Sequence, residues 1–156
     1  MEHPPKLVCF ALGEQIFALP IDAVQEAVEL RPITPVFLVP PFIRGIMNLR
    51  GEVVAVIDLL LLLGLETQQI SDHGRVVIVR DGTQRRDQRT AGLVADNLCS
   101  VLEPTADQIQ PPPATLPPRV TSHLRGLVST PDRPIMLLDL ERLFGSELLT
   151  PYRGRR

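Results

Sequence analysis

Short apolar runs separated by turn-forming residues recur along the whole chain, and this pattern predicts a mainly β protein. Residues 7–12 and 16–19 are apolar runs on either side of Gly13, which predicts a β-hairpin that ends at Pro20. Residues 76–79 and 91–95 repeat the arrangement around the charged loop at residues 81–89. The run at residues 76–79 is uniformly apolar, so we expect a buried strand there.

The stretch after the first hairpin fits two structures. Asp22 can cap a short helix over residues 23–29, in which Val24, Ala27 and Val28 recur at helical spacing. Residues 28–31 can as easily begin a strand. Prolines at positions 32, 35, 40 and 41 exclude a helix until after residue 41.

Residues 42–64 predict two strands joined by a turn and followed by a short helix. Residues 42–49 are mostly apolar around Gly45, which predicts a strand with a bend or bulge at the glycine. Residues 48–51, Asn-Leu-Arg-Gly, form the expected turn with Leu49 and Arg50 near its tip. We expect residues 52–57 to be a strand buried on both faces, and Asp58 to cap a helix that ends at Gly64.

The same pattern returns at residues 123–145, at a constant offset and without a gap. The identical pairs are Arg44 and Arg125, Gly45 and Gly126, Asp58 and Asp139, Leu59 and Leu140, Leu62 and Leu143, and Gly64 and Gly145. A weaker echo relates residues 21–29 to residues 95–103. An extended apolar run precedes each echo, at residues 7–12 in the first half and 76–79 in the second. The same pieces therefore occur twice in the same order, which predicts two similar subdomains. Residues 110–118, QPPPATLPP, are expected to be an extended connector.

Composition excludes several classes of partner and location. The formal net charge is −2, aromatic residues make up 4% and Trp is absent, so we expect no nucleic-acid partner. The longest apolar stretch, residues 53–65, is interrupted by Asp58 and is shorter than the ~20 residues of a membrane helix. The first ten residues lack the pattern of a secretory signal. We therefore expect a cytoplasmic protein with no direct membrane insertion.

Candidate chemistry is sparse. Cys9 and Cys99 stand apart in apolar surroundings, so we expect buried thiols and neither a metal knuckle nor a redox pair. The three histidines have no metal-ligand spacing, and no phosphate-binding glycine loop occurs. Asp58 and Asp139 are the strongest candidates for a hydrolase, but a helix cap explains both. The sequence predicts no enzyme, metal or cofactor.

The two copies differ most at the turn between their strands. The second copy has Ser-Thr-Pro-Asp at residues 129–132 where the first has Asn-Leu-Arg-Gly. In one interpretation Leu49 packs beneath the hairpin and Arg50 is a solvated charge. In the other the pair belongs to a protein interface, where arginine is enriched among the residues that dominate binding.

The run IRGIMNLRGEVVAVIDL, residues 43–59, resembles the signature of the chemotaxis coupling protein CheW family. The opening LVCFALGEQIFALPIDAVQEAVE, the VVIV strand, AGLVADNLCSVLEPTADQIQPPP, HLRGLVST and LLDLERLF resemble the same family in the same order. The resemblance covers nearly the whole chain. It implies a single CheW-like domain at residues 1–156, made of two five-stranded SH3-like β-barrels. The tail is polar and basic, and we expect flexible ends at about residues 1–5 and 150–156.

The resemblance also implies a function in chemotaxis. Family members are non-catalytic adaptors that couple the cytoplasmic tip of chemoreceptors to the regulatory domain of the histidine kinase CheA, in arrays at the membrane. The positions that match the family's partner-binding positions are Val24, Glu26, Gly45, Asn48, Leu49, Arg50 and Gly51. We expect them at a groove between the two barrels, where a receptor helix can lie.

Two alternatives stay open. The chain can be an adaptor of a twitching-motility or other receptor array without direct kinase contact. It can also be an SH3-like binder of proline-rich peptides, although that mode needs an aromatic-lined groove and the chain has one Tyr and five Phe. The resemblance assigns no role to the arginine-rich residues 85–89 or to the basic tail.

Overall fold

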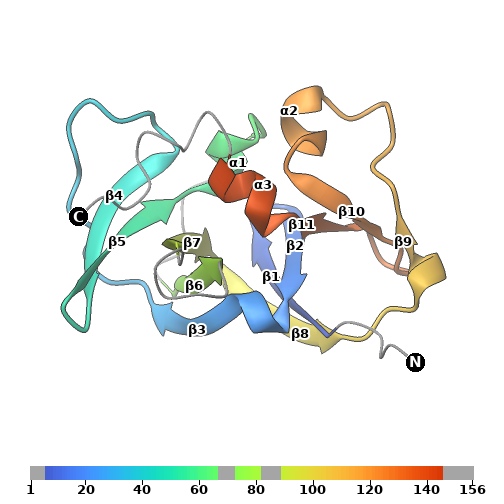
Figure 1. Ribbon diagram of the computed structural model, residues 1–156, viewed down its shortest axis with the longest axis horizontal. Helices are drawn as coiled ribbons and strands as arrows, with labels where there is room; N and C mark the ends of the chain where they lie inside the picture. Colours follow the sequence, from blue (N-terminus) through green and yellow to red (C-terminus); the bar gives the residue numbers. More distant parts are fainter. Residues whose placement is uncertain (1–5, 67–72, 82–88, 146–156) are drawn as a thin grey trace.

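A computed structural model describes residues 6–66, 73–81 and 89–145 of the chain, and these residues form two β-sheets with short helices (Figure 1). The predicted flexible ends and most of the arginine-rich loop lie outside the described residues. None of the helices in the described part is long and apolar enough to cross a membrane. The prediction of a mainly β protein is confirmed.

The first sheet has six strands in the order β8-β1-β2-β11-β10-β9. All neighbours are antiparallel except β11 and β2, which are parallel. The predicted hairpin is β1 and β2, and the proline-rich connector contributes its first residue to β9. The strands are β1 Leu7–Leu12, β2 Gln15–Pro20, β8 Asn97–Leu102, β9 Ile109–Gln110, β10 Leu124–Val128 and β11 Ile135–Leu138.

The second sheet has five strands in the order β3-β6-β7-β5-β4, with β5 and β7 parallel. These strands are β3 Val24–Glu29, β4 Ile43–Leu49, β5 Glu52–Ile57, β6 Arg75–Asp81 and β7 Arg89–Ala95. Three short α-helices and two 3-10 turns complete the described fold: α1 Leu59–Leu62, α2 Pro118–Thr121, α3 Leu140–Gly145, η1 Ile21–Ala23 and η3 Ala106–Gln108.

Each sheet combines a hairpin from one half of the chain with the copy of the repeat from the other half. The β1–β2 hairpin precedes the first copy, yet it shares a sheet with β10 and β11 of the second copy. The β6–β7 hairpin precedes the second copy, yet it joins β4 and β5 of the first. The strands of the weaker echo, β3 and β8, also pair with the opposite half of the chain, since β3 pairs with β6 and β8 pairs with β1. Each sheet is therefore built from both halves of the chain.

The repeated glycines occupy matching crowded positions. Gly45 has φ +145°, and a Cβ there would lie 2.2 Å from the carbonyl oxygen of Thr34. A Cβ on Gly126 would lie 2.6 Å from the carbonyl oxygen of Gln110. In each copy the register shifts at the glycine, which confirms the predicted bend at Gly45. A neighbouring backbone crosses so closely there that only glycine fits.

The two sheets share one hydrophobic core. Its larger cluster joins Phe10 and Phe17 of the six-stranded sheet to Val56 and Ile78 of the five-stranded sheet, and all four side chains are fully buried. A smaller cluster lies against the six-stranded sheet alone. Among the described residues neither strand order closes on itself, so the SH3-like form of the barrels stays a prediction.

Three local predictions are wrong. Residues 24–29 form strand β3 and not a helix, because pairing with β6 satisfies their backbone groups and a helix of seven residues is too short to be stable alone. The start of β5 is not buried on both faces, since Val53 is 67% exposed. Cys99 is exposed, because β8 is an edge strand whose first five residues are open to solvent.

Candidate protein-binding site

The β4–β5 turn is a two-residue turn with an unusual backbone. Leu49 pairs with Glu52, which leaves Arg50 and Gly51 as the central residues, with φ of 52° and 83°. Two positive φ angles define a type I′ turn, in which Asn-Gly is the favoured sequence. Asn48 Oδ1 accepts a hydrogen bond from the Gly51 N–H at 2.9 Å. Arginine in the left-handed region costs about 1 kcal/mol, so local preference does not explain Arg50.

Arg50 forms a two-pronged ion pair with Glu26 on β3. Its Nη2 donates to Glu26 Oε1 at 2.8 Å, and its Nη1 donates to Oε2. The Arg50 side chain is 68% exposed and that of Glu26 is 23% exposed. The register of β3 shifts between Val24 and Glu26, and the resulting bulge is of the kind that re-aims a side chain. The pair ties the turn to the edge strand of the same sheet.

The ion pair controls the protonation of its members. The hydrogen bonds from Arg50 lower the pKa of Glu26, and the charges of Arg50 and Arg31 lower it further. The same hydrogen bonds raise the pKa of Arg50. Glu26 is therefore a carboxylate throughout the neutral range. The turn presents a fixed positive and a fixed negative group side by side.

A groove of about 420 Å³ lies beside the turn. We call it the turn groove, and its lining is Arg31, Pro32, Thr34, Ile46, Met47, Asn48 and Val53. The segment between the groove residues Thr34 and Ile46 also carries two almost fully exposed apolar side chains, since Phe37 is 94% and Leu38 98% exposed. Sequence reasoning missed these two residues. An apolar Val-Phe-Leu run held between prolines, with no place in a predicted strand, was the signal that could have found them.

The seven predicted partner-binding residues divide by exposure. The side chains of Asn48 and Arg50 are exposed, Gly51 is exposed at the turn, and Glu26 is partly exposed. Val24 is half-buried and packs against the core. Gly45 and Leu49 are buried, so both serve the fold in this structure, as one interpretation of Leu49 holds. Their partner-binding role stays a prediction.

The predicted site residues gather in one of the two sheets. All seven lie on β3, β4 and the β4–β5 turn, which belong to the five-stranded sheet. The turn lies at the lower left of Figure 1, away from the six-stranded sheet. The turn groove is likewise formed within this half alone. In this structure Arg50 and its neighbours thus lie at the end of β4 and β5 that is remote from the other sheet, and a groove between two barrels stays a prediction.

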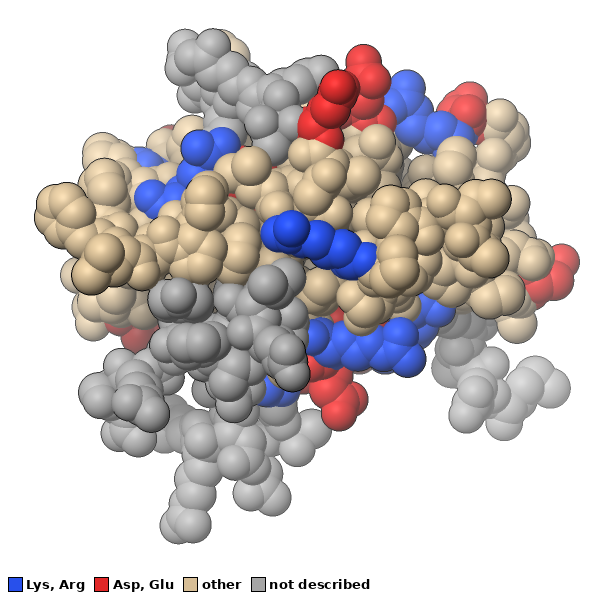
Figure 2. All heavy atoms as spheres, turned by 90° about the horizontal axis from the view of Figure 1, so that it is seen from above, with Lys and Arg blue, Asp and Glu red and all other residues tan. Residues whose placement is uncertain are grey.

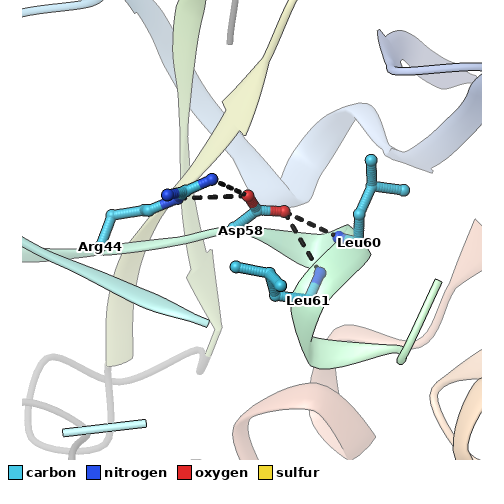
Figure 3. A network of polar contacts seen from close by, with 4 residues as sticks. All are labelled: Arg44, Asp58, Leu60 and Leu61. Carbon is cyan, nitrogen blue, oxygen red and sulfur yellow. Dashed lines mark hydrogen bonds and ion pairs between the residues drawn. The ribbon is translucent and has the colours of Figure 1, made fainter. Parts of the chain in front are cut away.

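Asp58, one of the two hydrolase candidates, has both carboxylate oxygens engaged (Figure 3). Its Oδ1 accepts from the backbone N–H groups of Leu60 at 3.0 Å and Leu61 at 3.3 Å, which confirms the predicted helix cap. Its Oδ2 accepts from Arg44 Nη2 at 2.7 Å and Nε at 3.2 Å. Asp58 is 1% exposed, so Arg44 balances a buried charge. Sequence reasoning missed this ion pair.

Asp139 caps α3 in the second copy but has a different cationic partner. Its Oδ1 accepts from the Arg142 N–H at 3.1 Å, and its Oδ2 lies 3.5 Å from Arg142 Nε. The two aspartates directly follow strands of different sheets, β5 and β11, and each caps its own helix. Within the described residues, no group of three or more His, Cys, Asp and Glu side chains is placed to hold a metal ion.

Charge does not gather on the face that carries the helices. Figure 2 shows this face with mostly uncharged surface, on which basic and acidic side chains stand in small separate groups. A partner that binds on this face would be recognised by local contacts and not by a long-range field.

Comparison with known proteins identifies the family. The model of the CheW-like domain matches residues 6–148. The chain is 32% identical to the chemotaxis protein CheW of Klebsiella aerogenes over 91% of this chain and 82% of that protein. It is 31% identical to the protein FrzA of Myxococcus xanthus, over 86% of this chain and 82% of that protein.

A solved structure agrees with the sequence comparison. The crystal structure of the scaffolding protein TtCheW from Thermoanaerobacter tengcongensis superposes with a TM-score of 0.81 at 33% identity. The match covers 97% of this chain and 99% of that one. The chain therefore belongs to the family of CheW-like domains.

Proposed function

We propose that this protein is a non-catalytic adaptor that couples chemoreceptors to a CheA-type histidine kinase in chemotaxis or a chemotaxis-like pathway. It is cytoplasmic and is recruited to receptor arrays at the membrane. The observation that carries the proposal is the Arg50–Glu26 pair, which stands on the surface at the Asn-Leu-Arg-Gly turn of a CheW-like chain. The proposal also includes the fold prediction that each sheet belongs to an SH3-like barrel.

The chemistry of the turn supports a role in protein binding. Arg50 keeps a strained backbone conformation and a largely exposed guanidinium, although Asn or Gly would suit the turn better. Strain at an exposed position is a reason to look for a function outside the fold. A guanidinium that is oriented in advance loses less entropy when it meets a partner's carboxylate or carbonyl group.

The turn groove supports a helical partner. Its lining combines the apolar Ile46, Met47 and Val53 with the polar Arg31 and Asn48. An amphipathic helix can lay its apolar face in such a groove while its polar residues meet the rim. The cytoplasmic tip of a chemoreceptor is the helical partner that we assign to this site, and the regulatory domain of the kinase is the second partner.

The hydrogen bonds and burial of Asp58 support the non-catalytic part of the proposal. A carboxylate that accepts two backbone N–H groups and a guanidinium, as Asp58 does, is held as a structural anion. A nucleophile or general base needs an oxygen that a substrate can reach, and Asp58 is 1% exposed. We therefore assign Asp58 and Asp139 to the fold.

Calorimetric titration with the regulatory domain of a CheA-type kinase, and separately with a receptor tip, tests the proposal. We expect Arg50→Glu to weaken binding of at least one partner by about ten- to a hundredfold, as expected of a dominant interface residue. Arg125→Glu is the matched control, because Arg125 is exposed on β10 of the other sheet and makes the same change of charge.

A charge swap separates recognition from folding. In the double variant Glu26→Arg with Arg50→Glu, the ion pair can form again with its charges reversed. Affinity that stays low in the swap means that a partner reads the charges at positions 26 and 50, whereas recovery of affinity means that the pair acts only through the fold. Unchanged affinity of Arg50→Glu for both partners would contradict the site. Binding to the receptor alone would favour an adaptor without direct kinase contact.

A further inference from the structure

The two cysteines, far apart in the sequence, face each other across the β1–β8 ladder. Val8 pairs with Val101 and Phe10 pairs with Leu98, so the register shifts between them. One residue of β1, Cys9, therefore lies opposite the pair Cys99 and Ser100 of β8. This is the geometry of a bulge on β8.

A cavity shows that the two thiols also lie on the same side of the sheet. Cys9 and Cys99 both line a cavity of about 800 Å³, together with Ala11, Ser100 and Leu102. Opposed residues of antiparallel strands have Cα atoms about 4.5–5.5 Å apart. Disulfides span Cα distances of about 4.4–6.8 Å. The register places Cys9 next to Cys99, and both cysteines line the same cavity, so the backbone brings the two thiols within the range in which a disulfide can form.

The two thiols differ in access and in acidity. Cys99 is exposed on the edge strand, whereas Cys9 is 2% exposed. Burial raises the pKa of Cys9 to about 11, and the nearby Cys99 adds to the increase. Cys9 is therefore a protonated thiol at neutral pH. An oxidant from solution reaches Cys99 first.

We propose that Cys9 and Cys99 form a dithiol that a low-molecular-weight disulfide, such as glutathione disulfide, oxidises to an intrachain disulfide. The Cys99 thiolate attacks one sulfur of the small disulfide, forms a mixed disulfide and releases one small thiolate. Cys9 then loses its proton and attacks the Cys99 sulfur, which releases the second small thiolate. Each released thiolate takes up one proton, so one small disulfide is reduced and two cysteine thiols are oxidised.

The bond would join the two halves of the duplicated chain. Cys9 lies on the hairpin that precedes the first copy, and Cys99 on the strand that leads into the second. A disulfide would close the long chain segment from Cys9 to Cys99 and so restrict the unfolded state. We therefore expect a Tm about 5–10 °C higher for the oxidised protein. The modification would also fix the edge strand β8 at the rim of the cavity.

The test incubates the reduced full-length protein in glutathione buffers of increasing oxidation, traps free thiols with N-ethylmaleimide and measures intact mass and peptide maps. We expect loss of two hydrogen atoms, no trapped thiol and a peptide that joins Cys9 to Cys99. We also expect the mixed disulfide to convert faster as the pH rises towards the pKa of Cys9. A stable mixed disulfide on Cys99, a covalent dimer or an unreacted protein would each overturn the proposal.

Two variants check the order of the steps. Cys9→Ala keeps the exposed thiol, so it should accumulate the mixed disulfide on Cys99 and go no further. Cys99→Ser removes the accessible thiol from an exposed position, so the protein should fold and stay unmodified. Oxidation of Cys9 in the Cys99→Ser variant at the wild-type rate would contradict the assigned order.

Discussion

The two copies of the duplicated unit carry the same arginine and aspartate, but only the first copy joins them. Arg44 binds the buried Asp58 at 2.7 Å, whereas Asp139 in the second copy pairs with Arg142 of its own helix. The side chain of Asp58 is 2% exposed and that of Asp139 is 15% exposed. The more deeply buried carboxylate needs a cation beside it, and the more exposed one is partly solvated by water. The same aspartate therefore has a different cationic partner and a different burial in the two copies.

The turns of the two copies also differ in the groups that hold their side chains. In the second copy, Arg133 Nη1 donates to the carbonyl oxygen of Glu14 at 2.8 Å, and Thr130 Oγ1 donates to the carbonyl of Arg133 at 2.5 Å. That turn is held by backbone acceptors of the β1–β2 turn and of the turn itself. In the first copy, the exposed Arg50 is paired with a partly exposed charge, Glu26. The first turn is therefore the one with side chains that a partner can compete for.

Removal of the buried carboxylate should show the largest difference between the copies. We expect Asp58→Ala to lower the free energy of unfolding by about 3 kcal/mol, because it removes a cap and leaves Arg44 without its partner. Asp139→Ala should cost about 1 kcal/mol, the value of a cap with a solvated ion pair. Urea unfolding of both variants measures the difference. Equal losses would mean that the buried pair adds nothing beyond the cap.

Substitution of the repeated glycines separates steric crowding from backbone strain. Gly45→Ala meets the Thr34 carbonyl oxygen and also requires a positive φ, so we expect a loss of roughly 2–4 kcal/mol. Gly126→Ala meets the carbonyl oxygen of Gln110 and the side chain of Ile109 but requires no positive φ, so it should cost less. Gly51→Ala has open space at φ +83° and should cost about 1 kcal/mol. A larger loss for Gly126→Ala than for Gly45→Ala, measured by urea unfolding, would reverse this order.

The exposed ion pair should produce the smallest effect on stability. The pKa of Glu26 is lowered in the folded state, so the contribution of the pair is present above the unfolded pKa and is lost as the pH falls through the folded pKa. Arg50→Asn suits the turn and removes the guanidinium, so the Tm should change by less than about 2 °C. NMR titration of the Glu26 carboxyl group should show a higher pKa in Arg50→Asn. An unchanged pKa would mean that the pair does not persist in solution.

Local features of the fold were predictable because neighbouring residues create them. The β1–β2 hairpin, the bend at Gly45 and the caps by Asp58 and Asp139 follow from turn residues and apolar runs within a few positions. The helix over residues 23–29 was wrong because long-range pairing with β6 outweighs helical spacing in so short a segment. Among the predicted site residues, Arg50 was placed correctly near the turn tip, while Leu49 lies in the core.

By itself, the sequence determined the duplication, the strand-turn-strand-helix unit, the family and the position of Arg50 at a turn. Only the tertiary structure decided which hairpin joins which copy, and it placed Glu26 beside Arg50, Arg44 beside Asp58 and Cys9 opposite Cys99. The reason is the range of the interactions. Caps and turns depend on adjacent residues, whereas the pairing of strands depends on the chain as a whole.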